Sequence, residues 1–283
     1  MMRIGVRAHD FGRMSPDELA SRIAAKGLTC VQLALNKAIA GLDLQAGDMT
    51  PGLAFHVGQA FQRNGVQIAV LGCYINPIHP DPAVRKGLLA FCKDHIRYSR
   101  DFGCGLVGLE TGSLNADYSP HPDNQGEAAF QQMLASISEL VQEAQRFGVV
   151  VGIEAVTSHT VSTPARMRRL LDTICSNNLQ VIFDPVNLIS LENHRDQDRI
   201  IRESFDLFGD RIAVIHAKDF TIHDGAYRQV RTGLGRLNYR LLMDLISRRK
   251  PGISILLEEA DESSAEGCVR TILDAASQVQ SDR

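Results

Sequence analysis

The chain has 283 residues, of which 44% are hydrophobic and 22% are charged. These proportions are typical of a globular protein and exclude a disordered one. Lys and Arg total 30 and Asp and Glu total 33, so the formal net charge is −3. A surface that is not basic predicts no nucleic-acid partner. Because no apolar stretch approaches the roughly 20 residues that span a bilayer, we also expect no membrane partner.

Cysteine usage and the first residues indicate the compartment. The six cysteines are widely spread and form no C-x-x-C pair, so we expect buried, reduced side chains. The segment Met1–Val6 enters a strand-like run without the apolar core of a signal peptide. Together these features predict a cytoplasmic protein. They leave the oligomeric state open, a homo-oligomer included.

Short apolar segments alternate with longer amphipathic segments along the whole chain. The near-continuous Val, Ile and Leu content of the short segments is typical of parallel strands that are buried on both faces. The predicted strands are Ile4–Arg7, Cys30–Ala34, Gln67–Leu71, Leu106–Glu110, Val149–Glu154, Gln180–Asp184, Arg211–His216 and Ile253–Glu258. No linker divides the chain, so we expect one domain over residues 1–283. This α/β alternation predicts a parallel sheet, which is either a closed (β/α)₈ TIM barrel or a doubly wound open sheet.

Helix boundaries carry the expected signals. Ser15-Pro16 and Thr163-Pro164 each combine a capping side chain with a proline at the first helical position. Glycines stand between a helical segment and the next strand, where a left-handed residue ends a helix, at Gly27, Gly65, Gly103 and Gly148. The segment from Phe220 to Arg236 has no regular pattern, and we expect a long loop there.

The last four predicted strands each end on a side chain that can bind a metal. These side chains are Glu154, Asp184, His216 and a glutamate at 258 or 259. From 154 to 184 and from 184 to 216 the gaps are 30 and 32 residues, close to the roughly 31 residues of one unit in a barrel of about 250. The carboxyl ends of barrel strands surround one cavity, so this spacing favours the closed barrel.

Crowded carboxylates need a cation. Three carboxylates at one barrel mouth would repel one another unless a positive charge neutralised them. Carboxylates with one imidazole and no thiolate suit Mn²⁺, Mg²⁺ or Co²⁺, with Zn²⁺ as an alternative. A single acid at a strand end is usually a loop hydrogen-bonding residue, but four consecutive strand ends are not explained in that way. We expect one divalent metal ion, with Mn²⁺ preferred.

From Gly148 to Glu259 the chain resembles the xylose-isomerase-like superfamily of sugar isomerases and epimerases. That superfamily includes tagatose and psicose 3-epimerases, inosose-processing enzymes and endonuclease IV. The motifs that carry the resemblance are Gly-Ile-Glu154, Phe-Asp184-Pro-Val-Asn187, Ile-His216-Ala-Lys218-Asp219 and Leu-Leu-Glu258-Glu259. It implies that Glu154, Asp184, His216 and Glu258 bind the metal and that Glu154 and Glu258 also act as catalytic acid and base.

The choice between the two adjacent glutamates has two grounds. Successive residues of a strand point to opposite faces, so only one of Glu258 and Glu259 can reach the barrel mouth. The apolar run Ile253–Leu257 leads to Glu258 without interruption. The resemblance likewise places the ligand at the first acid, so we expect Glu258.

Polar residues near the other strand ends are candidate substrate contacts. His9 and Glu110 follow or end predicted strands and are as compatible with a capping or loop-packing role. His159 lies five residues after Glu154 and before a helix cap, and Lys218 could bind a substrate oxygen or pair with Glu258. Asn187 stands where the ketose 3-epimerases have a substrate-contacting histidine. That departure counts against a ketose 3-epimerase, although Asn187 itself remains a candidate contact.

These features predict a metal-dependent isomerase or epimerase of a small sugar or polyhydroxy carbonyl compound. Glutamate would remove a carbon-bound proton, and the metal would stabilise the resulting cis-enediolate. The alternative is a metal-dependent dehydratase or lyase acting on an inosose or keto-sugar. Two others are less favoured. An endonuclease IV-like phosphodiesterase would need more histidines, and a non-catalytic sugar-binding barrel would bind sugars without metal.

Overall fold

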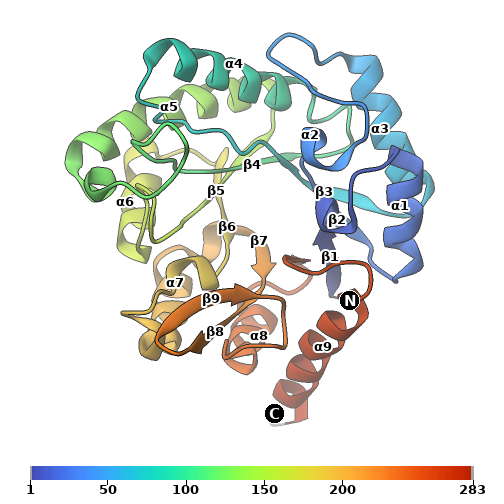
Figure 1. Ribbon diagram of the computed structural model, residues 1–283, viewed down its shortest axis with the longest axis vertical. Helices are drawn as coiled ribbons and strands as arrows, with labels where there is room; N and C mark the ends of the chain where they lie inside the picture. Colours follow the sequence, from blue (N-terminus) through green and yellow to red (C-terminus); the bar gives the residue numbers. More distant parts are fainter. Residues whose placement is uncertain (1, 282–283) are drawn as a thin grey trace.

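Eight parallel strands close into a barrel in the computed structural model, which describes residues 2–281 (Figure 1). The strands are β1 (Arg3–Arg7), β2 (Cys30–Leu33), β3 (Gln67–Gly72), β4 (Leu106–Glu110), β5 (Val150–Glu154), β6 (Leu179–Phe183), β7 (Ile212–Ala217) and β10 (Ser254–Leu257). The sheet closes because β1 pairs with both its neighbours, Gly5 lying opposite Cys30 of β2 and opposite Leu256 of β10. This closure excludes the open sheet and confirms the predicted (β/α)₈ barrel. The predicted strand ends differ from the observed ones by at most one residue.

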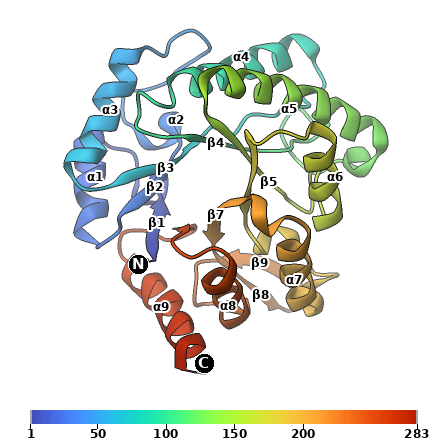
Figure 2. The same ribbon diagram turned by 180° about the vertical axis from the view of Figure 1, so that it is seen from behind.

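Helices surround the barrel on its outside, as both faces of the ribbon show (Figures 1 and 2). They are α1 (Pro16–Ala25), α2 (Leu35–Ala38), α3 (Pro51–Arg63), α4 (Pro82–Tyr98), α5 (Glu127–Phe147), α6 (Pro164–Ile174), α7 (Gln197–Phe208), α8 (Tyr239–Arg249) and α9 (Ala265–Ser281). Short 3₁₀ turns lie at Ala8–Phe11, Pro122–Gln125, Val186–Leu188, His194–Asp196 and Gly209–Arg211. The apolar faces of the helices and the outward faces of the strands form the main hydrophobic core.

The helix boundaries follow the expected local chemistry. Ser15 Oγ accepts a hydrogen bond from Glu18 N at 3.3 Å, and Thr163 Oγ1 accepts one from Arg166 N at 3.2 Å. Both pairs satisfy a backbone N–H that has no partner within the helix. The four predicted glycines all have φ between 63° and 72°, the left-handed region in which a side chain would be strained.

Apolar side chains fill the inside of the barrel, so the barrel is not a channel. Cys30, Val70, Leu106, Ile182, Val214 and Leu256 form this inner cluster. Gly5 is needed beside it, because a Cβ there would lie 1.9 Å from the backbone oxygen of Cys30. The polar residues at the carboxyl ends of the strands therefore rest on an apolar floor.

The segment from Phe220 to Arg236 corrects one expectation. It is not a long irregular loop, because an antiparallel hairpin occupies most of it, with strands β8 (Asp219–His223) and β9 (Ala226–Val230). The turn is formed by Asp224 and Gly225, both at positive φ. A local signal for this hairpin is present in the sequence, because Asp224-Gly225 is a typical two-residue hairpin turn and stands between the segments Phe-Thr-Ile-His and Ala-Tyr-Arg-Gln-Val.

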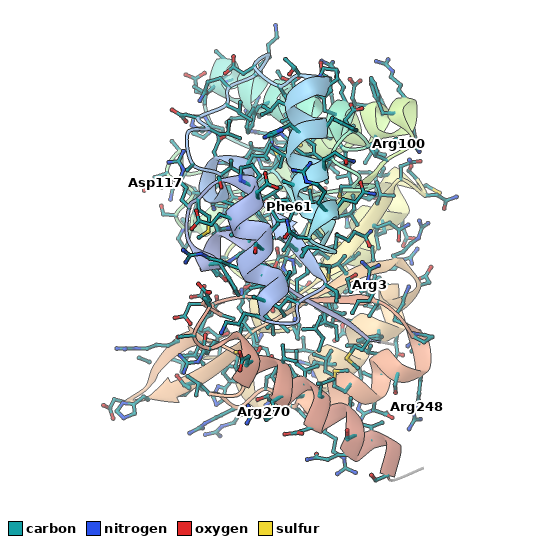
Figure 3. The ribbon with its side chains drawn as sticks, turned by 90° about the vertical axis from the view of Figure 1, so that its right-hand side faces the viewer. Arg3, Phe61, Arg100, Asp117, Arg248 and Arg270 are labelled. Carbon is teal, nitrogen blue, oxygen red and sulfur yellow. The ribbon has the colours of Figure 1, made fainter. Side chains whose placement is uncertain are left out.

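The hairpin marks the functional side of the barrel. In the side view it projects on the same side as Asp117 of the β4–α5 loop, whereas Arg3 and Arg100, near the amino ends of strands, lie on the opposite side (Figure 3).

Two further expectations concern the burial of the cysteines and the presence of membrane-spanning helices. Five of the six cysteines are buried as expected, whereas Cys175, at the C-terminal cap of α6, is exposed. Within residues 2–281, no helix combines the length and apolar character that crossing a bilayer requires.

Candidate active site

The four predicted ligand residues lie at the carboxyl ends of four barrel strands. Glu154 is the last residue of β5, Asp184 follows β6, His216 belongs to β7 and Glu258 follows β10. All four are buried, with at most 4% of each residue exposed. Buried carboxylates are rare unless a partner compensates the loss of hydration, so the surroundings of these groups decide what they can do.

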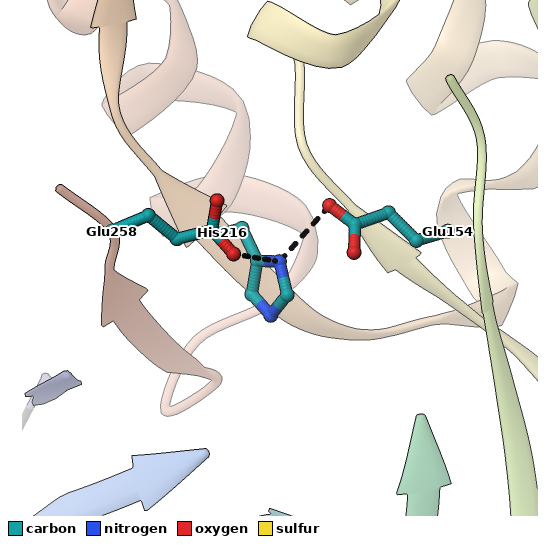
Figure 4. A group of neighbouring side chains, drawn as sticks. All are labelled: Glu154, His216 and Glu258. Carbon is teal, nitrogen blue, oxygen red and sulfur yellow. Dashed lines mark hydrogen bonds and ion pairs between the residues drawn. The ribbon is translucent and has the colours of Figure 1, made fainter. Parts of the chain in front are cut away.

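Three of the four converge on one point. Ligand-capable atoms of Glu154, His216 and Glu258 all lie within 4.8 Å of one another. His216 Nδ1 is 3.1 Å from Glu154 Oε1 and 3.2 Å from Glu258 Oε1. The two glutamates approach the imidazole from opposite sides (Figure 4).

Asp184 lies beside this group and is connected to it by Lys218. Its Oδ1 accepts backbone hydrogen bonds from Val186 N at 2.8 Å and Asn187 N at 3.3 Å. Its Oδ2 is 3.0 Å from Lys218 Nζ, which also donates to Glu258 Oε2 at 2.9 Å. The structure therefore brings together three predicted ligands and holds the fourth next to them through an ammonium group.

The pKa values in this cluster reflect both burial and the charges of neighbouring groups. Burial raises the pKa of Asp184, and Lys218 offsets only part of that effect. Burial also acts against ionisation of Glu258, but Lys218, His216 and Arg7 outweigh it and hold the pKa of this carboxyl well below its usual range. Burial lowers the pKa of His216, yet the carboxylates of Glu154 and Glu258 more than reverse this and raise it to about 9.

The charges and donor atoms fit a divalent cation. Three buried carboxylates and one ammonium leave an excess of two negative charges when His216 is neutral. The guanidinium of Arg7 lies 3.6 Å from Glu258 Oε2 but removes only part of this excess, because it pairs more closely, at 2.9 Å, with both Asp10 and Glu259. The high pKa of His216 means that the imidazole takes up a proton at Nδ1, between the two carboxylates, when nothing else supplies charge there. A metal displaces such a proton when it binds.

A polar cavity of about 290 Å³ opens above this cluster. All five predicted substrate contacts line it: His9, Glu110, His159, Asn187 and Lys218. The other lining residues are Arg7, Gln32, Lys37, Tyr74, Val156, Gln229 and Glu259, together with Glu154 and Glu258. Val156 is the only aliphatic side chain among them, so the cavity suits a ligand rich in hydroxyl groups.

Several buried polar atoms in the cavity wall have no hydrogen-bond partner among the described residues. They include His9 Nδ1, Tyr74 Oη, His159 Nδ1 and both polar atoms of the Gln32 side chain. His159 Nδ1 lies 3.3 Å from Glu110 Oε2, without the geometry of a hydrogen bond. Buried polar groups are normally satisfied, and exceptions that gather in one cavity indicate a place where a polar ligand binds.

Three more of the predicted residues, Asn187, Glu110 and His159, differ in their hydrogen bonds and in the direction of their pKa shifts. Asn187 Nδ2 donates to Glu154 Oε1 at 2.8 Å, and Asn187 Oδ1 accepts from Gln229 Nε2 at 3.1 Å. The Glu110 pKa is raised by burial and by the charges of Glu154 and Glu258. Burial lowers the pKa of His159 to about 4, so this imidazole is neutral at pH 7.

The two adjacent glutamates face different surroundings. The Glu258 side chain is 6% exposed and contacts His216, whereas the Glu259 side chain is 49% exposed and pairs with Arg7. Glu259 has φ 57°, so the backbone leaves the strand conformation directly after Glu258. The geometry thus favours Glu258 as a ligand, which stays a prediction.

Some of the residues that line the cavity were not predicted from the sequence. Gln32 carries a signal in retrospect, since it is the single polar residue in the apolar strand Cys30–Leu33. Arg7 likewise ends its strand as a charged residue. Gln229 has no such signal, because only the hairpin brings it to the barrel mouth.

A larger cavity, of about 550 Å³, lies elsewhere. It is formed by α3 and the turn before β4, near Gly65 and Gly103 and so at the amino ends of the strands. None of the predicted residues lines it. Barrel enzymes carry their chemistry at the carboxyl ends, so we assign the candidate site to the smaller polar cavity.

Comparisons with known proteins agree with the barrel. A family model described as xylose isomerase-like TIM barrel matches residues 20–277. A search of curated proteins found no significant match.

Solved structures give the same picture at low identity. A D-tagatose 3-epimerase-like protein is 17% identical, with a TM-score of 0.77 and 99% of each chain covered. A D-psicose 3-epimerase from Clostridium cellulolyticum H10, solved with D-tagatose, is 16% identical, with a TM-score of 0.72 and coverage of 98% of this chain and 99% of that one. A structure of IOLI protein with a binding zinc atom is 14% identical, with a TM-score of 0.71 and 99% of each chain covered. At these identities the similarity shows the fold.

Proposed function

The chain belongs to the xylose isomerase-like TIM barrel family, and we propose that it is a divalent-metal-dependent enzyme that isomerises or epimerises a small sugar or polyhydroxy carbonyl compound. Two of the named structural relatives are a D-tagatose 3-epimerase-like protein and a D-psicose 3-epimerase. Their low identity leaves the reaction of this chain to be argued from its own residues.

One observation carries the proposal. Glu154, His216 and Glu258 meet within 4.8 Å at the base of a polar cavity, buried and short of positive charge. A site built only to stabilise the fold gains little from such a group, because removing two carboxylates from water beside an imidazole is costly. A site that holds a cation next to a substrate needs such a group of buried ligands.

Glu154, His216 and Glu258 would hold the metal, with Asp184 as the fourth ligand. A divalent cation there would supply Lewis-acid stabilisation of the negative charge that develops on the substrate oxygens. One structural relative was solved with a bound zinc atom, which supports a divalent ion in this barrel family, and Mn²⁺ as the preferred ion of this chain is part of the proposal.

Glu154 and Glu258 are the proposed acid and base. They lie on opposite sides of His216, so one carboxylate can remove a carbon-bound proton and the other can return one to the opposite face. Asn187 holds Glu154 Oε1, and Lys218 holds Glu258 Oε2. These contacts orient each carboxylate and leave its second oxygen for other partners.

The cavity wall would bind the substrate hydroxyls. His9, Glu110 and His159 line the same cavity. Neutral His159 offers one donor and one acceptor, which matches a hydroxyl group. Lys218 itself would contact a substrate oxygen that approaches Glu258.

The metal is tested first. Purified protein should contain close to one divalent ion per chain, measured by elemental analysis after dialysis against Mn²⁺. EDTA should remove both the ion and the activity. His216→Ala should lose the ion while its circular dichroism remains that of a folded barrel. Protein that binds no divalent ion under any of these conditions would rule out the proposed site.

The proton transfer is tested separately by NMR in D₂O, over ketoses, inososes and keto-sugars with Mn²⁺ present. The wild type should introduce deuterium at the reacting carbon. Glu154→Gln keeps an oxygen ligand but loses the base, so exchange should fall by a factor of roughly 10² to 10⁴ while metal remains bound. Conversion without deuterium incorporation would instead indicate a hydride shift and would remove the roles proposed for both glutamates.

A further inference from the structure

A third cavity, of about 580 Å³, adjoins the polar cavity on its β3–β4 side. It shares three lining residues with the polar cavity, Lys37, Tyr74 and Glu110. This third cavity, which we call the side cavity, is formed by the β3–α4 loop, the first turns of α4 and the β4–α5 loop. It therefore opens at the same carboxyl end of the barrel as the candidate site.

The chemistry of the side cavity differs from that of the polar cavity. Ile75, Val84, Leu88 and Ala116 give it aliphatic walls, and the rings of Tyr74, Tyr118 and His79 also line it. Val84 is 44% exposed although it is a large apolar residue. Exposed apolar side chains that face a cavity next to a polar site indicate a ligand with an apolar part.

Local structure holds the aromatic walls in place. Tyr74 lies against Gly72, where a Cβ would come within 2.9 Å of its ring, so only glycine leaves room for the ring. Lys37 Nζ lies 5.3 Å from the centre of the same ring. Tyr118 has φ 69°, a conformation that costs free energy in a non-glycine residue. Its ring packs edge-on against the ring of His159, with 4.8 Å between the ring centroids.

The two loops around the side cavity are joined by a buried asparagine. Asn76 Nδ2 donates to Ser113 O at 2.8 Å and to Asn115 O at 3.1 Å. Asn76 Oδ1 accepts from Ser113 N at 3.2 Å and from Ile78 N at 3.3 Å. The walls are thus fixed relative to one another, as a preformed binding site requires.

We propose that the side cavity is a subsite for an aromatic substituent of the substrate. The substrate is then a polyhydroxy carbonyl compound that carries an aryl group, and its hydroxyls occupy the polar cavity while the aryl group lies between Tyr74, Tyr118 and Val84. The assignment of the sugar part rests on the proposed function, whereas the aryl subsite involves no residue of the proposed metal site.

The first test uses the aryl group alone. Binding of 4-fluorobenzyl alcohol is followed by ¹⁹F NMR in a buffer that contains EDTA and again in a buffer that contains Mg²⁺ but no Mn²⁺. The alcohol should bind the wild type equally in both, because the side cavity contains no predicted metal ligand. Val84→Trp and Ala116→Trp fill the cavity from two walls and should abolish binding. Leu273→Trp, at a 46% exposed position on α9 that lines neither cavity, should bind like the wild type.

The second test uses ligands that combine a sugar and an aryl group in one molecule. D-fructose is compared with its 1-O- and 6-O-(4-fluorobenzyl) ethers by titration in the presence of Mg²⁺. One ether should bind about ten- to a hundredfold more tightly than D-fructose, the gain expected from burying a phenyl ring. Val84→Trp should remove this gain and leave D-fructose binding unchanged.

The outcomes separate the two proposals. If 4-fluorobenzyl alcohol binds the wild type no better than it binds Val84→Trp and Ala116→Trp, the aryl subsite is overturned, whatever the enzyme does to sugars. If the alcohol binds as expected but no metal or proton exchange is found, the subsite stands and the proposed function fails.

Discussion

At the scale of single residues, burial separates side chains that are neighbours in sequence. Glu258 and Glu259 are chemically identical and both line the polar cavity, yet Glu258 is buried against His216 whereas Glu259 is half exposed and pairs with Arg7. The strand period places them on opposite faces, and the left-handed backbone at Glu259 completes the separation. Their different surroundings give a direct mutational comparison.

We predict that Glu258→Gln eliminates turnover and weakens metal binding, because it removes a charge from the buried cluster. Glu259→Gln should change turnover little and cost less than about 1 kcal/mol of stability, since it breaks only a half-exposed ion pair. Steady-state kinetics and metal titration of both variants check this. The opposite ranking would show that the second glutamate enters the site.

Gln32 gives a prediction in which stability and binding respond differently. Its side chain is fully buried and neither polar atom has a partner among the described residues. An unsatisfied buried amide costs about 1 to 3 kcal/mol. Gln32→Leu should therefore leave the free energy of unfolding unchanged or raise it, while the KM for substrate rises about tenfold or more. Loss of stability with an unchanged KM would show that the amide has a structural role.

At the scale of elements, the β8–β9 hairpin forms one wall of the site and depends on a buried aspartate. Asp219 Oδ1 accepts from Phe220 N at 2.9 Å and Leu237 N at 2.8 Å, and Oδ2 accepts from Gly233 N at 3.2 Å. These bonds connect the start of the hairpin to the segment that follows it. The hairpin in turn places Gln229 against Asn187, which holds Glu154.

We predict that Asp219→Ala destabilises the protein by about 2 to 4 kcal/mol, because several buried backbone N–H groups lose their acceptor. The Leu237 amide should lose hydrogen-exchange protection. Asp219→Asn keeps one acceptor oxygen and should cost less. Equal stability of the alanine variant and the wild type in urea would contradict this account of the hairpin.

At the scale of the whole molecule, buried neutral histidines make the fold sensitive to acid. His95 of α4 is 2% exposed, its Nδ1 lies 3.0 Å from Phe91 O, and its ring packs on Phe91. Burial lowers its pKa from 6.5 to about 4. Between these two values the unfolded chain binds the proton and the folded chain does not, so the stability present above pH 6.5 falls as the pH falls towards 4.

We predict that His95→Gln reduces the loss of stability between pH 7 and pH 4.5 by roughly 2 to 3 kcal/mol, the energy that corresponds to this shift. Glutamine retains an N–H donor but does not titrate. Urea unfolding at both pH values measures the effect. His223→Gln, at a side chain that is 82% exposed, serves as the control and should leave the pH dependence unchanged. A similar pH dependence in wild type and His95→Gln would show that His95 does not carry the acid sensitivity.

The sequence alone determined the barrel and the positions of its strands. Buried parallel strands need continuous apolar runs, and helices need capping residues. The positions of strands and helices therefore follow from short segments of sequence, such as Val150–Glu154 and the cap at Ser15. The metal-ligand candidates could also be predicted, because strand-end residues one βα unit apart must meet at the barrel mouth. Their roles as ligands stay predictions until a metal is measured.

Only the tertiary structure decided how these residues are partnered. Lys218 lies between Asp184 and Glu258, Asn187 holds Glu154, and Gln229 reaches the site from the β8–β9 hairpin. Each contact joins residues from different strands or loops, and its distance depends on the register and closure of the barrel. Local preferences set which residues end a strand, but the charge around each of them depends on segments that are distant in sequence and adjacent only in the folded chain.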